Sequence, residues 1–150
     1  MKFTTLLAAA TVALSLTAGL AMAGATDDII KARKGCMKAN GASMGTFVPM
    51  MKGEKPFDAA AVATAVTAVE AACADWAKWW GPETKAGEME KTAAKAEIWT
   101  DAAGFEKAGM AYYTALQAIK AAKDDAGFKT AFAGFGGSCK GCHETYRAAE

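Results

Sequence analysis

The sequence lacks a surplus of charge of either sign and, beyond its first residues, a long apolar run. Lysine and arginine number 17, against 16 aspartates and glutamates. Without a basic surplus we expect no nucleic-acid partner. No segment after residue 23 approaches the roughly 20 apolar residues of a membrane span, which excludes a span in the mature chain. β-type alternation, internal repeats and low-complexity tracts are also missing, so the pattern favours helices.

The first 23 residues have the pattern of a secretory signal peptide. Lys2 supplies the positive start, residues 6–20 form an apolar core, and Ala21-Met22-Ala23 is a small-x-small cleavage site. We therefore expect residues 1–23 to be removed and residues 24–150 to form one domain in the periplasm. Removing Lys2 leaves basic and acidic side chains equal in number.

Two of the four cysteines lie in a short motif with the single histidine. Cys139-Lys140-Gly141-Cys142-His143 has the C-x-x-C-H pattern that attaches a c-type haem covalently. We predict one haem c, bound through thioethers from Cys139 and Cys142, with the His143 imidazole as the first axial ligand of the iron. Attachment of this cofactor outside the cytoplasm agrees with the predicted export.

A zinc or dithiol redox site is the alternative interpretation of the motif. Cys36 or Cys73 would then supply a further zinc ligand, and the purified protein would be colourless. A structural zinc site usually brings two separated ligand pairs, and a thioredoxin-like dithiol needs a strand-to-helix turn. Neither pattern is present in the sequence, which favours haem.

No methionine follows the motif. The last residues are Glu144-Thr145-Tyr146-Arg147-Ala148-Ala149-Glu150, and the last methionine before the motif is Met110. Any sixth ligand of the iron must therefore come from upstream, on another helix.

Four segments have helical periodicity, and three breaks separate them at Pro49–Pro56, Gly81–Glu90 and Ala122–Asp125. We expect the first helix to open at Thr26 as its N-cap, with Asp27 and Asp28 in its first turn. The second should run from Asp58 to about Trp80, the third over about 96–121, and the fourth from about Asp124 through the motif. Short connections predict an all-α, antiparallel up-down four-helix bundle that encloses the haem.

The chain resembles the class II c-type cytochromes, the cytochrome c′ family, over its mature length. The resemblance rests on Cys139 to Arg147, on Ile98-Trp99 with Phe105, and on Arg33 to Met44. Cytochrome c′ is itself a standard example of an up-down bundle, so the resemblance and the predicted fold are not independent.

The resemblance implies roles for three further residues. Arg33 would lie near a haem propionate, Met37 over the distal face of the iron, and Arg147 on the proximal side. The alternatives are a solvated surface arginine for Arg33, core packing for Met37 and a helix-dipole contact for Arg147. Trp99 and Tyr146 would pack against the haem.

The family contains two chemistries, and Met37 decides between them. Lys38, Asn40-Gly41 and Met44 resemble the branch in which a methionine thioether completes a low-spin iron. We therefore interpret the protein as a periplasmic electron-transfer protein, with iron ligated by His143 and Met37, and not as an enzyme. Its partners would be periplasmic redox proteins. The alternative is a five-coordinate cytochrome c′ that binds nitric oxide or carbon monoxide, and either form could be a monomer or a homodimer.

Cys36 and Cys73 depart from the family pattern. Folding the first helical hairpin about residues 50–56 brings the two positions to similar heights on neighbouring helices. An exported location would let a disulfide persist. A disulfide and two small buried thiols are both compatible with the sequence.

Overall fold

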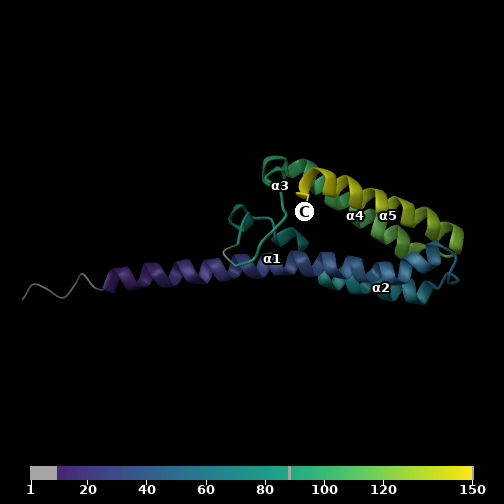
Figure 1. The fold of residues 1–150 in the computed structure, drawn as a ribbon, viewed down its shortest axis with the longest axis horizontal. Helices are drawn as coiled ribbons and strands as arrows, with labels where there is room; N and C mark the ends of the chain where they lie inside the picture. The colour runs from purple at the N-terminus through teal and green to yellow at the C-terminus, as the bar shows by residue number, and fades with distance from the viewer. Residues whose placement is uncertain (1–9, 88, 150) are drawn as a thin grey trace, which may run out of the picture.

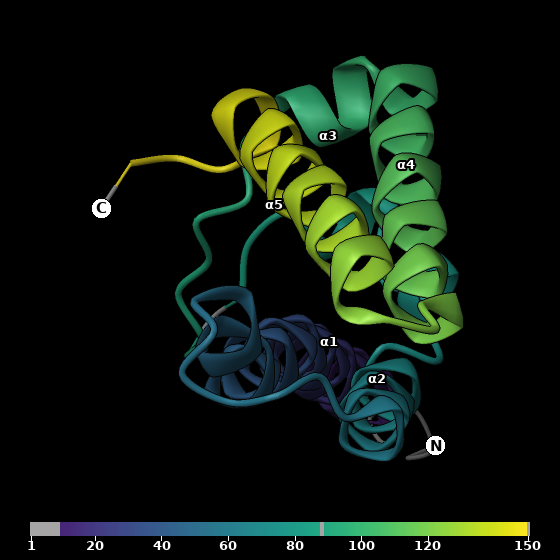
Figure 2. The same cartoon turned by 90° about the vertical axis from the view of Figure 1, so that its right-hand side faces the viewer.

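The computed structural model describes residues 10–149 except residue 88, and for residues 10–23 it describes the backbone alone. Of the predicted signal peptide, residues 1–9 lie outside the described residues and residues 10–23 are described by their backbone alone. The long helices are α1 (Ala10–Met51), α2 (Ala59–Ala72), α4 (Ala102–Ala121) and α5 (Asp125–Tyr146). They form the predicted antiparallel up-down bundle, in which the α1/α2 pair faces the α4/α5 pair (Figures 1 and 2).

The predicted start of the first helix at Thr26 is wrong for this chain. α1 is continuous from Ala10, so Asp27 and Asp28 lie in the helix interior. The preceding segment is rich in alanine and leucine, which favour helix, and no proline separates it from Thr26. α1 therefore extends well beyond the rest of the bundle (Figure 1).

The first break begins after Met51, three residues later than predicted, because Pro49 lies inside the last turn of α1. The helix ends in a Schellman motif. Glu54 N donates to the Pro49 carbonyl at 2.9 Å and Gly53 N donates to the Met50 carbonyl at 3.1 Å. Gly53 adopts φ +73°, a left-handed conformation that suits glycine.

The second helix is shorter than predicted. α2 begins after its N-cap, Asp58, as expected, but it ends at Ala72. Two 3₁₀ turns follow, η1 (Trp76–Lys78) and η2 (Pro82–Thr84). Pro82 has no N–H with which to continue a helix, and the Trp79 and Trp80 carbonyls accept side-chain hydrogen bonds instead.

By length and composition alone, Ala59–Lys78 is apolar enough to cross a membrane, with a mean hydropathy of 1.2. Its α-helical part is α2, and Val62, Val66 and Val69 of α2 are buried in the bundle core. Three valines of this stretch therefore pack in the bundle core, while 17% of the stretch as a whole is buried.

The predicted third helix is broken into two. A short α3 (Glu97–Thr100) precedes α4, and Asp101 between them has the non-helical angles φ −123° and ψ 58°. The Asp101 carboxylate caps α4 by accepting from Gly104 N at 3.1 Å. The start of α5 agrees with the prediction, since Asp124 is its N-cap and accepts from Gly127 N at 2.8 Å.

The core contains two apolar clusters. The larger one joins all four long helices; its buried members are Phe47, Met50, Val62, Val66, Val69, Leu116, Ile119, Phe128 and Phe135. The smaller cluster, called here the tryptophan cluster, has Ile98, Phe105 and Tyr146 at its centre, with Trp76, Trp80 and Trp99 packed around them.

Candidate haem-binding site

The two cysteines of the motif project from α5 toward different clusters. Cys139 packs against the larger core cluster and Cys142 against the tryptophan cluster. Both are partly buried and both are free thiols. Burial raises the pKa of each thiol, so both are protonated at neutral pH. The motif therefore presents two unpaired thiols on the inward side of the last helix.

His143 follows Cys142 and lies on the more exposed side of α5. Partial desolvation, and then the positive charge of Arg147, lower the pKa of the imidazole. At neutral pH the imidazole is therefore uncharged, which is the form that coordinates a metal. Arg147 is the C-cap of α5, four residues beyond His143, and its charge acts on the imidazole.

The C-terminal end of α5 is held by contacts with the chain before α4. The Tyr146 hydroxyl donates to the Asp101 carboxylate at 2.8 Å. Lys95 N donates to the Tyr146 carbonyl at 3.0 Å, and Ala148 N donates to the Ala93 carbonyl at 2.8 Å. These contacts fix the orientation of the helix end that carries the motif.

Arg33 is buried, with 6% of its surface exposed, so its interpretation as a solvated surface arginine is wrong. Its Nη1 donates to the Thr84 carbonyl at 3.0 Å, and its Nη2 donates to the Trp79 carbonyl and the Thr84 hydroxyl. The guanidinium also stacks over Trp80, with 4.1 Å between Cζ and the ring centroid. Burial lowers the pKa of Arg33 to about 10, and the charge of Glu83 opposes this shift.

Two buried hydrogen-bond donors, one on Arg33 and one on the tryptophan stacked on it, have no partner among the described residues. They are Arg33 Nε and the indole Nε1 of Trp80. An unsatisfied buried donor costs about 1–3 kcal/mol, so this pair is suited to an acceptor such as a carboxylate.

The tryptophan cluster brings Arg33 and the motif to the same part of the molecule. The Trp80 ring meets Phe105 with 4.7 Å between centroids, and Phe105 meets Tyr146 at 5.1 Å. Cys142 packs on the same cluster. Trp99 Nε1 donates to the Trp80 carbonyl at 2.9 Å and so helps to hold the 3₁₀ segment in place. Residues far apart in the sequence thus surround one side of the motif.

Met37 lies one turn after Arg33 on α1, and 37% of its surface is exposed. Within the described part of the chain it belongs to neither apolar cluster, so the core-packing alternative is not supported. Cys36, directly before it, forms a disulfide with Cys73, with 4.9 Å between the Cα atoms. Of the two alternatives left open for Cys36 and Cys73, the structure therefore has the disulfide, and both cysteines are removed from any metal-ligand set.

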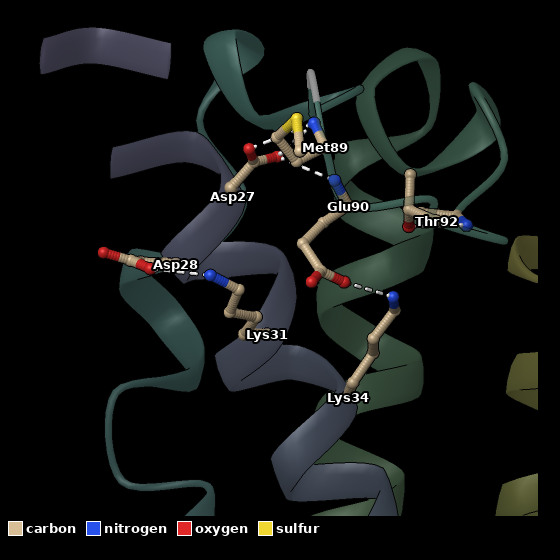
Figure 3. A network of polar contacts seen from close by, with 8 residues as sticks. Asp27, Asp28, Lys31, Lys34, Met89, Glu90 and Thr92 are labelled. Carbon is tan, nitrogen blue, oxygen red and sulfur yellow. Dashed lines mark hydrogen bonds and ion pairs between the residues drawn. The ribbon is translucent and has the colours of Figure 1, made fainter. Parts of the chain in front are cut away.

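Asp27 is a buried residue in the interior of α1, and not the first-turn aspartate that the sequence pattern predicts. It is 5% exposed, and its carboxylate accepts from Met89 N at 3.1 Å and from Glu90 N at 3.0 Å (Figure 3). Lys34 adds an ion pair to Glu90 at 2.6 Å. Together with Arg33, these contacts attach the 79–90 segment to α1. The position of Asp27 three residues before the buried Ile30 was the available signal that it faces the interior.

These features fit a c-type haem better than a metal ion held by side chains alone. The described residues contain no group of three or more histidine, cysteine or acidic side chains that could hold a metal. They do offer two free thiols, a neutral imidazole and two buried donors without a partner, Arg33 Nε and Trp80 Nε1. A haem supplies vinyl groups, an iron and propionates that match these three features.

The fold is an up-down four-helix bundle, and its last helix carries a C-x-x-C-H motif. Together these features are typical of helical proteins that bind a c-type haem. The family model described as cytochrome C′ matches residues 28–147. Cytochrome c′ of Cereibacter sphaeroides is 40% identical over 131 residues, covering 85% of this chain and 87% of the relative. Cytochrome c-556 of Agrobacterium fabrum is 38% identical over 120 residues, covering 79% and 80%.

Solved structures agree with the sequence comparisons. Cytochrome c′ from Rubrivivax gelatinosus has a TM-score of 0.72 at 31% identity, covering 81% of this chain and 96% of that one. A nitric oxide complex of a cytochrome c prime variant from Alcaligenes xylosoxidans has a TM-score of 0.71 at 31% identity, covering 83% and 97%. The chain therefore belongs to the cytochrome c′ family.

Membership confirms the predicted cofactor, one covalently attached haem c. Proteins of this family are periplasmic, and they act in electron transfer or in binding small gases. The low-spin, methionine-ligated branch that the sequence analysis preferred is less well supported than its alternative. Several of the similar solved structures are nitric oxide complexes of cytochrome c prime variants from Alcaligenes xylosoxidans.

Proposed function

We propose that the protein is an exported, five-coordinate cytochrome c′ that binds nitric oxide or carbon monoxide at a ferrous haem. Cys139 and Cys142 form the two thioethers, and His143 is the single protein ligand of the iron. Arg33 and Trp80 receive a propionate through their unsatisfied donors. No side chain in this assignment transforms a substrate, so the protein is not an enzyme.

The observation that carries this proposal is the placement of Met37. Its thioether is partly exposed and lies outside both apolar clusters, on the helix pair opposite the one that carries the motif. A flexible, unclustered side chain suits a distal cover that a diatomic gas can displace. The similarity to a structure solved with nitric oxide supports the same assignment.

The proposal is tested by optical spectra of the haem-loaded protein, ferric and dithionite-reduced, before and after carbon monoxide. We expect broad high-spin bands and prompt binding of carbon monoxide. Met37→Ala should leave the resting spectrum unchanged and speed gas binding by enlarging the distal space. Met110→Ala is the matched control, because Met110 is 60% exposed on α4 and should affect neither.

A second candidate is the low-spin electron carrier in which Met37 binds the iron. The thioether one turn after Arg33 favours it, because thioether sulfur is a normal sixth ligand of haem iron. Relatives named cytochrome c-556 also match this chain. The low-spin carrier would give sharp absorption bands in the reduced protein, slow gas binding, and a change to high spin in Met37→Ala. These results together would overturn our proposal.

Export and assembly complete the proposed function. Residues 1–23 act as the signal peptide, and the mature protein begins at Gly24 in the periplasm. Mass spectrometry of the purified protein from a haem-attaching host tests the cleavage site. The mature protein is a monomer or a homodimer, and it exchanges electrons with periplasmic partners.

A further inference from the structure

The turn of α1 that carries Met37 is held on both sides. Cys36, directly before Met37, is fully buried and is bonded to Cys73 at the C-cap of α2. Asn40, three residues after Met37, contacts both the disulfide and the opposite helix pair. Met37 therefore lies within one helical turn of both the disulfide of Cys36 and the hydrogen bonds of Asn40.

The amide of Asn40 has both of its ends engaged. Its Nδ2 donates to the Cys36 carbonyl at 3.0 Å and lies 3.9 Å and 3.8 Å from the Sγ atoms of Cys36 and Cys73. Its Oδ1 accepts from the Tyr112 hydroxyl at 2.8 Å. These contacts define the orientation of the amide, since the donor faces α2 and the acceptor faces α4.

Tyr112 carries the connection to the helix pair that holds the motif. Its ring packs on Phe135 of α5, with 5.7 Å between centroids. Tyr112 and Cys139 both pack against the larger core cluster. α1 packs mainly on α2 and α5 mainly on α4, so the Asn40–Tyr112 hydrogen bond joins the pair that bears Met37 to the pair that bears the motif.

We propose that the Cys36–Cys73 disulfide, Asn40 and Tyr112 form a positioning frame that holds Met37 at a set distance from the haem and thereby limits the entry of gas. The frame touches neither the gas nor the iron; it acts through the position of the α1 turn. This inference rests on the proposed function, because it assigns the frame to the distal side of that same haem.

The sharpest test is Tyr112→Phe in the haem-loaded protein, since it removes one hydroxyl and keeps the ring on Phe135. We expect the association rate of carbon monoxide with the ferrous protein, measured by flash photolysis, to rise about three- to tenfold, the range of one buried hydrogen bond. Tyr113→Phe is the matched control, because Tyr113 is the next residue and is 52% exposed. The carbon monoxide association rate of Tyr113→Phe should equal that of the wild type.

Two variants of Asn40 separate positioning from general damage. Asn40→Ala removes the acceptor and should match Tyr112→Phe, and combining the two changes should add little further. Asn40→Asp keeps an oxygen for the Tyr112 hydroxyl but loses the donor to the Cys36 carbonyl, so its rate should lie between those of the wild type and Asn40→Ala. Haem content and far-UV circular dichroism should stay constant throughout. If Tyr112→Phe does not fold, the Asn40 pair carries the same test.

The outcomes distinguish this inference from the proposed function. If the wild type binds carbon monoxide and Tyr112→Phe and Asn40→Ala both match Tyr113→Phe, the frame is overturned and the proposed function stands. If the wild type is low-spin and inert to carbon monoxide, the proposed function fails. The frame then predicts partial loss of the low-spin spectrum in Tyr112→Phe and in Asn40→Ala but not in Tyr113→Phe, and an unchanged spectrum in the first two would overturn it as well.

Discussion

Reducing the Cys36–Cys73 disulfide should lower the free energy of unfolding by about 4 kcal/mol. The bond closes a loop with a sequence separation of 37 residues, and the loss of chain entropy in the unfolded state for such a loop gives about 4 kcal/mol at 25 °C. For a mature domain of about 127 residues this corresponds to about 15 °C in Tm. The proposed haem thioethers lie outside the loop, so haem attachment does not replace the constraint.

Urea denaturation of the haem-loaded protein with and without a phosphine reductant measures this difference. Cys36→Ala/Cys73→Ala is the control, because it should be as unstable as the reduced wild type and should not respond to the reductant. A loss below about 1 kcal/mol on verified reduction would refute the entropic reasoning. An equal response of the double variant would show that the reductant acts elsewhere.

The remaining predictions concern the contacts around α1 and the charge of the motif. Asp27→Ala should lower the free energy of unfolding by about 1.5–3 kcal/mol, because two backbone N–H groups lose a charged acceptor; Asp27→Asn should lose less, and equal stability of all three proteins in urea would contradict this. Arg33→Lys should cost about 1–3 kcal/mol in the same assay, since lysine cannot reach several acceptors and stack on Trp80 together; an unchanged midpoint would argue against a structural role. In the haem-free protein the lowered pKa of His143 means that the unfolded chain takes up the proton first, so stability should fall as the pH drops below about 6.5. Arg147→Ala should weaken this dependence by raising the pKa, as an NMR titration of the imidazole would show.

The sequence alone determined the elements with strong local signals. The C-x-x-C-H motif identified the haem class, because its three residues must be adjacent to serve one cofactor. Asp58 and Asp124 marked the starts of α2 and α5, since an aspartate N-cap acts on the backbone two or three residues ahead. Periodicity also gave the four-helix topology.

The tertiary structure decided the features that depend on distant partners. α2 ends at Ala72 although the apolar pattern continues, and Arg33 and Trp99 hold the segment that follows by binding the Trp79 and Trp80 carbonyls. The third helix breaks at Asp101, which binds Tyr146 from the end of the chain. The burial of Asp27 is explained by backbone amides about 60 residues away. Local propensity carries no information about such contacts, because each partner is brought close only by the folded bundle.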